Sequence, residues 1–338
     1  MATATSETGS LEEPRTKTTE PPRPAEQVHV FEPYRYALPK LGPYFRDVWA
    51  RRQFATHMAS STLKGQHFDS FFGQFWLVLN PMLLALVYFL LTSVLGGQSG
   101  AGTSAMNHFV GLLTGLFAFF YTRNVIQFAA SSITGGGKMI INMSFPKMLL
   151  PLSTTFTAML TYFPTLLVYA CFYIGVHHRV NAEVLWVIPI FIIQTVFSFG
   201  LGLLFAAVTL YFRDMSTLLP YVLRIWMYIT PVLFSLNYIK SKTVPDPVTG
   251  KTSLPHWILG VYKWDPFSPI INSWNTALVG DGPRPFWKGG TINGHFYAAA
   301  SYTPQMTEIL IGAVCAVIAL VVGAWYFMSR EREFAVRL

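Results

Sequence analysis

The longest charge-free stretch of this sequence places the strictest limit on what the chain can fold into. From Ser70 to Thr122 there is no Asp, Glu, Lys or Arg. A helix that crosses the hydrocarbon core of a membrane needs roughly 20 predominantly apolar residues. Glycines between residues 96 and 102 interrupt the stretch. It therefore predicts two membrane-spanning helices joined by a short loop.

The composition agrees with a membrane protein. Hydrophobic residues make up 52% of the 338-residue chain and charged residues only 12%, against roughly 25% charged residues in an ordinary soluble domain. Lys and Arg exceed Asp and Glu, which gives a formal net charge of +8. In a membrane protein such basic residues flank the spans and contact the head groups of membrane lipids, so no binding of nucleic acid is expected.

Four further apolar runs bring the prediction to six transmembrane helices. The expected fold is therefore an all-α integral membrane protein. An even number of spans also places both ends of the chain on one side of the membrane. The predicted spans lie near residues 76–95, 107–130, 148–176, 184–211, 218–236 and 309–328.

The short loops predict the orientation, because short cytosolic loops are enriched in Lys and Arg. The short outer loops, 97–106 and 177–183, contribute only Arg179. We therefore expect a multi-pass protein of the plasma (inner) membrane with both termini in the cytosol. The basic residues on the cytosolic side are Arg46, Arg51, Arg52, Lys64, Lys138, Lys147, Arg213, Arg330, Arg332 and Arg337.

The segments before the first span are polar. Residues 1–40 are rich in Thr, Glu and Pro and predict a disordered cytosolic tail, with a docking site for a partner as the alternative. Residues 41–338 form the membrane domain. Within it, residues 44–68 mix charges with aromatic side chains and predict an amphipathic helix in the membrane interface. An ordinary cytosolic helix packed on a domain is less favoured, because the sequence offers no such domain.

The sequence contains no motif for catalysis or metal binding. The segment SSITGGGKM resembles a phosphate-binding loop, but that loop requires Gly where Ser132 stands and Ser or Thr where Met139 stands. Neither HExxH nor GxSxG occurs. We expect no catalytic residue, no metal site and no cofactor in this chain. An integral membrane glycosyltransferase or acyltransferase is an alternative, but the spans offer almost no Asp, Glu or His for it.

The loop between the second and third spans, ITGGGKMIINMSFPKMLLP, is the most informative segment. Its glycines end the second span, the residues that follow can form a short exposed helix, and Phe145-Pro146 ends that helix. Such a helix has little of its own chain to pack against, so we expect it to dock in a partner's groove. A tight turn without a partner is the alternative. The expected contact residues are Lys138, Met139, Ile140, Ile141, Asn142, Met143 and Phe145.

The fifth span carries unusual residues. Arg213 and Asp214 precede it and are expected to cap the adjoining helix ends. Arg224 lies inside it, where a charge either faces a cavity or partner or extends back to the head groups. Pro220 and Pro231 are expected to kink or break the helix.

Residues 237–304 form an outer loop that is rich in aromatic side chains. The stretch HWILGVYKWDPFSPIINSWNTALVG alternates apolar residues with Pro and Gly, which favours short re-entrant helices in the outer half of the membrane. Such helices can close the outer mouth of a channel. An ordinary folded loop is the alternative. The candidate outer gate residues are Trp264, Phe267, Ile270 and Trp274.

From about Tyr44 to Leu338 the chain resembles the membrane subunit of type-2 ABC exporters (ABC-2 type). The similar branch exports polysaccharides such as O-antigen, teichoic acid or cell-wall galactan, linked to a polyprenyl lipid. The string GTINGHFYAAA and the amino-terminal tail are similar to actinobacterial galactan exporters. The resemblance rests on the order and spacing of LKGQHFDSFFGQFWLVLNPM, INMSFPKMLLP, YFRDM, LPYVLRIWMYITPVLF, DPFSPIINSW and REREFAVRL.

The resemblance implies a homodimer of this chain with two copies of a separate ATPase, which would bind ATP and Mg²⁺. A continuous channel would run between the two halves. Residues 134–145 would form the coupling helix, and the 44–68 helix would touch the ATPase. The implied function is export of a polyprenyl-diphosphate-linked polysaccharide. An ABC-2 drug or lipid exporter is the alternative within transport. Arg224 departs from the family, which often carries Gln there.

Aromatic side chains suit a channel for sugars, because sugar rings stack on them and can slide past. Aromatic residues make up 16% of the chain. Membrane helices are aromatic-rich in any case, so packing or lipid contact is the alternative role for each residue. The candidates for lining the channel are Phe75, Tyr88, Phe89, Arg224, Trp226, Tyr228 and Phe234.

Overall fold

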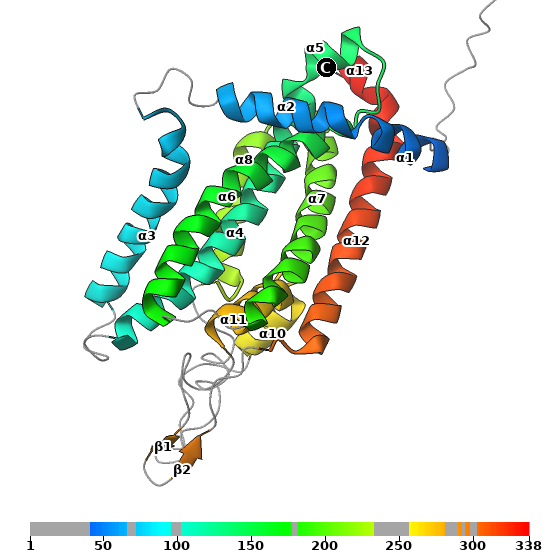
Figure 1. Cartoon of the computed structure of the whole chain (residues 1–338). Helices are drawn as coiled ribbons and strands as arrows, with labels where there is room; N and C mark the ends of the chain where they lie inside the picture. Colours follow the sequence, from blue (N-terminus) through cyan, green and yellow to red (C-terminus); the bar gives the residue numbers. More distant parts are fainter. Residues whose placement is uncertain are drawn as a thin grey trace, which may run out of the picture. The chain divides into compact units, whose positions relative to one another are not determined.

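The computed structural model describes residues 41–65, 72–95, 103–177, 182–232, 257–280, 290–292, 295–297 and 303–337. Within these ranges the chain is helical apart from short connections and one two-stranded hairpin (Figure 1). The tail predicted over residues 1–40 lies outside the described residues.

Four long helices form the centre of the bundle. They are α4 (Thr103–Gly135), α6 (Leu149–His177), α7 (Val187–Tyr211) and α12 (Met306–Arg330). Helix α7 packs against both α4 and α12, and α6 packs on α4. Each of the four is long and apolar enough to cross a membrane. The chain is therefore a helical membrane protein, as the sequence predicts.

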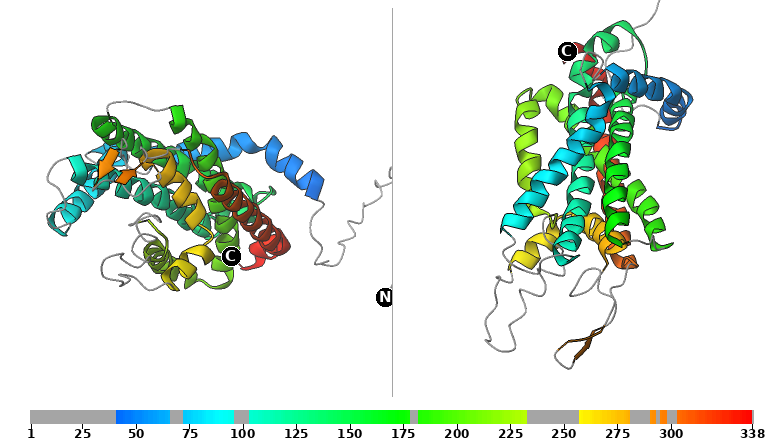
Figure 2. Two further views of the ribbon diagram at one scale, coloured as in Figure 1. Left: turned by 90° about the horizontal axis from the view of Figure 1, so that it is seen from below. Right: turned by 60° about the vertical axis from the view of Figure 1, so that its left-hand side comes forward.

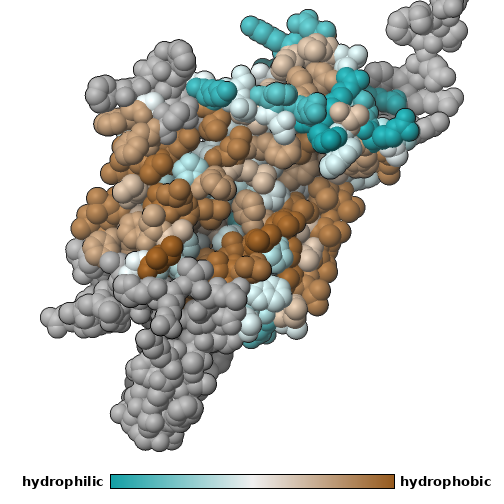
Figure 3. Space-filling view, viewed as in Figure 1, coloured by the Kyte–Doolittle hydropathy of each residue, from teal (hydrophilic) through white to brown (hydrophobic). Residues whose placement is uncertain are grey.

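The surface agrees with this assignment. On the face seen in Figure 3, hydrophobic residues cover the middle of the bundle, and hydrophilic residues gather at one end. That end carries the short helix α5 and the last helices of the chain, and we call it the α5 end. The opposite end, where α11 lies, is the α11 end. A broad apolar surface next to a polar end agrees with a protein whose helices lie in a bilayer.

Helix α3 (Trp76–Leu95) covers the residues of the first predicted span and packs on α6 and α4. It is apolar but shorter than the four central helices. Among the described residues, four helices are both long and apolar enough to cross a membrane. The number of six spans stays a prediction.

Glycines allow α7 and α12 to approach closely. A Cβ atom on Gly200 would collide with the backbone of Ala319 and Leu320, and one on Gly323 would collide with the carbonyl oxygen of Gly200. Close backbone approach through small residues is a main source of helix association in membranes, where the hydrophobic effect between helices is absent. The α7–α12 contact therefore depends on Gly200 and Gly323, because glycine has no Cβ atom to keep the two backbones apart.

A buried polar network holds α4, α7 and α11 together. The amide nitrogen of Gln194 donates to the carbonyl oxygen of Ala118 at 2.6 Å and to Thr122 Oγ1 at 2.9 Å. The indole nitrogen of Trp274 donates to Gln194 Oε1 at 2.7 Å. Because a polar group in an apolar interior is costly without partners, this network fixes α11 on the bundle.

Helix α8 (Met215–Ile229) differs from the predicted fifth span, 218–236. Its 15 residues are fewer than the roughly 20 that a span needs. Thr230 has ψ 146°, an extended conformation, and Pro231 follows it. A residue before proline is disfavoured in helical conformation, which explains the end. Asp214 occupies the N-cap position of α8 but makes no side-chain capping hydrogen bond, so the capping role predicted for Arg213 and Asp214 stays a prediction.

Two helices stand where one was predicted over residues 44–68. These are α1 (Leu41–Ala50) and α2 (Arg52–Gly65), with Arg51 between them. Arg51 Nε donates to Asp47 Oδ1 at 3.0 Å, and its Nη1 lies 3.5 Å from the carbonyl oxygen of Ser144. Figures 1 and 2 show both helices lying across the α5 end of the bundle, where α2 packs on α6.

Helices α10 (Trp257–Trp264) and α11 (Ser268–Val279) lie at the α11 end. Helix α11 packs on α4, α7 and α12. The hairpin pairs β1 (Gly290–Ile292) with β2 (His295–Tyr297) in antiparallel register and departs from the all-helical prediction. The remaining short elements are η1 (Gly73–Phe75), α5 (Gly137–Asn142), η2 (Ala182–Trp186), η3 (Glu331–Glu333) and α13 (Phe334–Arg337).

Candidate functional site

The segment predicted to dock with a partner contains the short helix α5. Its six residues are fewer than the predicted range 134–145, because Gly135 still belongs to α4. A Cβ atom on Gly136 would lie 2.7 Å from Leu150 Cδ1 and 2.9 Å from the carbonyl oxygen of Ser132. Only glycine permits this approach, which turns the chain sharply from α4 into α5. The helix ends where Met143 becomes extended.

Helix α5 has one buried and one exposed side. Ile140 is only 5% exposed and packs with the core near the α5 end, together with Met139. Ile141 and Met143 are 64% and 56% exposed. The exposed side therefore presents two large apolar side chains to whatever lies beyond the chain. Apolar side chains grouped in this way are typical of protein contact surfaces.

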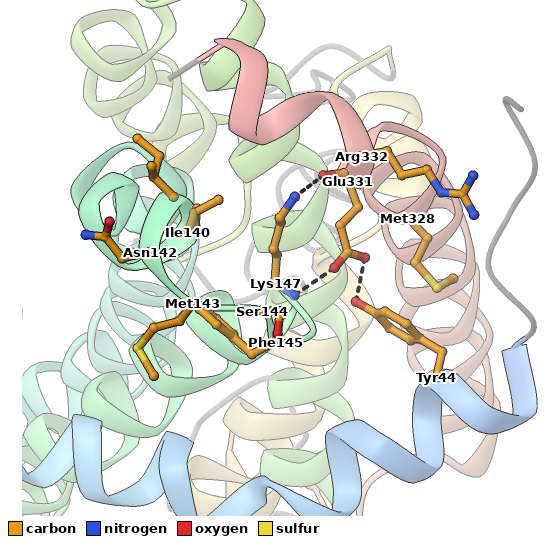
Figure 4. Close-up of a pocket in the computed structure, with 11 residues that line it drawn as sticks. Tyr44, Ile140, Asn142, Met143, Ser144, Phe145, Lys147, Met328, Glu331 and Arg332 are labelled. Atoms are coloured by element: carbon orange, nitrogen blue, oxygen red, sulfur yellow. Dashed lines mark hydrogen bonds between the residues drawn. The ribbon is translucent and has the colours of Figure 1, made fainter. Parts of the chain in front are cut away.

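A groove lies beside this segment (Figure 4). Its volume is about 660 Å³. Residues 140–145 form one wall, and the start of α1 and the end of α12 form the other. The individual residues of the second wall and floor are Tyr44, Lys147, Met328, Glu331 and Arg332.

Glu331 joins three distant parts of the chain at the floor of the groove (Figure 4). The hydroxyl of Tyr44 donates to Glu331 Oε2 at 2.7 Å, and the backbone N–H of Lys147 donates to Oε1 at 2.7 Å. Lys147 Nζ donates to the backbone carbonyl oxygen of Glu331 at 2.7 Å. We call Tyr44, Lys147 and Glu331 the Glu331 cluster. The cluster connects α1, the connection between α5 and α6, and the residue that follows α12.

Burial governs the titration of this cluster. Desolvation raises the pKa of Tyr44 well above its ordinary value, and the nearby Glu331 raises it further. Desolvation lowers the pKa of Lys147, while Glu331 opposes that effect. Tyr44 therefore keeps its proton and remains a hydrogen-bond donor at neutral pH.

Sequence reasoning missed the Glu331 cluster. Its members are separated by 184 and 287 positions along the chain, so no local pattern brings them together. One signal was present: the closing string REREFAVRL belongs to the stretches that carry the family resemblance. A second contact of the same string is Tyr211, which donates to Glu333 Oε2 at 2.6 Å.

The predicted channel-lining residues lie on α3, α8 and η1, and their role stays a prediction. Phe75 and Tyr228 are exposed, whereas Tyr88 is partly buried against the core of the bundle. Trp226 instead points into the core, where its indole nitrogen donates to Asp265 Oδ1 at 2.9 Å. The remaining candidates are Phe89, which packs on Phe109, Arg224, which is exposed, and Phe234, which lies outside the described residues.

The predicted outer gate residues divide into two groups. Trp264 is 89% exposed at the end of α10. Phe267, Ile270 and Trp274 are buried in the core of the bundle. The structure therefore places one of the four at the surface and uses the other three to anchor α11. Their role in gating stays a prediction.

Comparison with known proteins supports a transporter rather than an enzyme. No model of a protein family matches the chain. Two Klebsiella pneumoniae proteins, both named O-antigen export system permease protein RfbA, are 26% and 24% identical to it. The matches cover 66% and 82% of this chain and 78% and 92% of those proteins. A Myxococcus xanthus protein of the same name is 26% identical over 59% of this chain and 74% of its own length.

These relatives confirm the resemblance to polysaccharide-export permeases that the sequence motifs indicate. Within the described residues, no group of three or more His, Cys, Asp or Glu side chains could hold a metal ion.

Proposed function

We propose that this chain, similar over most of its length to O-antigen export permeases, is the channel-forming subunit of an ABC exporter. Its substrate is a polyprenyl-diphosphate-linked polysaccharide, such as a cell-wall galactan or an O-antigen-like chain, which it moves across the plasma membrane. Two copies of a separate ATPase bind ATP and Mg²⁺ and supply the energy. A second copy of this chain completes the channel.

The single observation that carries the proposal is the form of the α5 segment. A helix of six residues is held on the bundle by Ile140 while Ile141 and Met143 remain exposed beside a groove. The Glu331 cluster ties this segment to the end of α12. A push on α5 by a partner would therefore be transmitted to a long membrane helix rather than absorbed by a loose loop.

The charge distribution supports a cytosolic position for the α5 end. Lys138, Arg213 and Arg337 lie there, at the ends or turns of α5, α8 and α13. Basic residues next to spans favour the cytosolic side. An ATPase that uses cytosolic ATP can then reach α5.

The exposed face of α8 supports a channel between two copies. Tyr221, Arg224 and Tyr228 recur at helical spacing on this face. Helix α8 also exposes aliphatic residues such as Ile225, but the exposed residues of α12 from Leu310 to Trp325 are all apolar and lack hydroxyl or charged groups. An aliphatic face suits lipid, whereas a face with hydroxyl and guanidinium groups suits a wet conduit or a partner. We therefore assign α8, together with α3, to the channel.

Depletion of the protein in its host tests the proposed transport. The expected result is that a lipid-linked glycan accumulates on the cytosolic side, and that an ATPase co-purifies with the chain in mild detergent. Replacing Ile141 by Glu in the same cells should reproduce the accumulation. If lipid-linked glycans stay at their normal level after depletion, the proposed substrate class is wrong.

A further inference from the structure

Two arginines lie on the packed helices α4 and α8, where Arg123 is partly buried and Arg224 is exposed. Helices α4 and α8 pack through Ile126 and Leu223, with neighbouring apolar residues on both helices. Arg123 lies one turn before Ile126 on α4, and Arg224 follows Leu223 directly on α8. The packing of Ile126 on Leu223 therefore places the two arginines on neighbouring stretches of the same helix pair.

Neither guanidinium group has a carboxylate partner in the part of the chain that the structure describes. The salt bridges found there involve Arg51, Arg330 and Arg337 at the α5 end. Arg123 lies over the Phe120 ring, 5.6 Å from its centroid, and its Nε is 3.4 Å from Gln127 Oε1. These neighbours orient the Arg123 side chain but do not neutralise its charge.

The pair lies well inside the helices. Arg123 is twelve residues from the end of α4 at Gly135, and Arg224 is nine residues from the start of α8 at Met215. At about 1.5 Å per residue these positions are about 18 and 14 Å along the helix axes from the α5 end. Charged groups at such depth are costly and mark the path of a substrate or ion. Two cations so placed require an anion to offset their charge.

A phosphate ester on a lipid is the anion that fits. Arginine donates two parallel hydrogen bonds to phosphate oxygens in a fixed planar geometry. A diphosphate offers two phosphate groups to two guanidinium groups, whereas a phospholipid head group offers one. The exposed rings of Tyr221 and Tyr228 lie about one turn on either side of Arg224 and can contact sugar or isoprenoid groups.

We propose that Arg123 and Arg224 together bind the diphosphate of the lipid-linked substrate inside the membrane. This assignment rests on the proposed function, because it takes a diphosphate lipid as the substrate. The pair holds the head group while the attached glycan enters the channel. Gln127 and Phe120 position the Arg123 side chain.

The test measures binding of geranylgeranyl diphosphate to the full complex in phosphatidylcholine nanodiscs, with geranylgeraniol and inorganic pyrophosphate as separate arms. Arg123→Gln and Arg224→Gln are each expected to weaken binding of geranylgeranyl diphosphate about tenfold or more. Arg224→Lys should retain part of the binding because it keeps the charge. Arg213→Gln is the matched control, since Arg213 is exposed at the turn before α8, and it should bind as the wild type does.

Each contrary result overturns the assignment. Binding that is unchanged in both Gln variants would exclude the pair as a diphosphate site. Loss of binding by addition of phosphatidylglycerol, with no preference for the diphosphate, would show that the pair binds phospholipid head groups instead. Glycan accumulation on depletion is scored separately, so that unchanged binding in the arginine variants removes this inference alone and leaves the proposed transport function intact.

Discussion

At the scale of single residues, Glu331 is the side chain that joins the most distant parts of the sequence. It accepts hydrogen bonds from groups that precede it by 287 and 184 positions and that belong to different elements. The Glu331 carboxylate holds these elements together by accepting two hydrogen bonds. Removing it destabilises the fold, because two donors lose their acceptor.

Replacing Glu331 by Ala is therefore expected to destabilise the α5 end. Loss of the shared acceptor leaves the Tyr44 hydroxyl and the Lys147 N–H unpaired, which costs about 1–3 kcal/mol for each group that water does not reach. The melting temperature of the purified chain in detergent should fall by several degrees. Asp214→Ala is the matched control, because Asp214 is exposed and makes no side-chain capping hydrogen bond, and should change stability by less than about 0.5 kcal/mol. Equal melting of the two variants would contradict the role given to the Glu331 cluster.

Tyr44 gives a pH-dependent test of the same cluster. Its pKa is raised above the ordinary value of 10.0, so the folded chain keeps the phenol proton when the unfolded chain has lost it. This contribution to stability is complete below about pH 10 and is lost as the pH rises further. Between pH 8 and 11 the wild type should therefore lose stability more steeply than Tyr44→Phe, as followed by thermal unfolding. Parallel pH profiles would show that Tyr44 is not buried as described.

At the scale of elements, α5 separates two kinds of apolar residue within one short helix. Ile140 packs into the core, whereas Ile141 points away from it. Ile140→Ala should lower the free energy of unfolding by about 2–4 kcal/mol because it leaves a cavity. Ile141→Glu should leave the melting temperature nearly unchanged but reduce the ATPase activity that depends on contact with this chain. If Ile141→Glu leaves that ATPase activity unchanged, α5 does not form the contact with the ATPase.

The glycines of α7 and α12 provide a second test at this scale. Gly323→Ala inserts a methyl group against the backbone of Gly200 and is expected to destabilise the bundle by about 1–3 kcal/mol. Gly175→Ala on α6 meets open space, so it should be neutral or stabilise the helix by up to about 1 kcal/mol. The two substitutions should therefore shift thermal unfolding in opposite directions. A destabilising Gly175→Ala with a neutral Gly323→Ala would contradict the described helix packing.

Local patterns predicted most elements but not their contacts. The apolar runs located α3, α6, α7 and α12 within a few residues, because length and apolarity of a span depend on the segment alone. Pro231 was recognised as a possible break, yet the end of α8 at Ile229 required its backbone conformation. The break at Arg51 between α1 and α2 was missed, since nothing in the periodicity marks it.

The site was predictable to a similar degree. The glycines and the Phe-Pro pair of the α5 segment indicated a short helix, which is present. The burial of Trp274 was not predictable, because its partner Gln194 is 80 positions away and lies on another helix. Arg123 lies within the predicted second span, but its position relative to Arg224 depends on how α4 and α8 pack on each other.

At the scale of the whole molecule, the proposed function is that of a conduit that depends on a partner for energy. The described residues offer apolar spans, a tightly tied α5 end and an α8 face with tyrosine and arginine side chains. The related O-antigen export permeases agree with transport as the task. Under the proposed function, transport is a property of the assembly, because a second copy would complete the channel and a separate subunit would carry the ATP-binding sites.

The most direct test of this claim is transport in proteoliposomes that contain the chain either alone or with its co-purified ATPase. The account predicts that a lipid-linked glycan crosses the bilayer only when both proteins and ATP with Mg²⁺ are present, and that Ile141→Glu abolishes this movement while ATP still binds. ATP hydrolysis or chemical change of the glycan by the purified chain alone would contradict it.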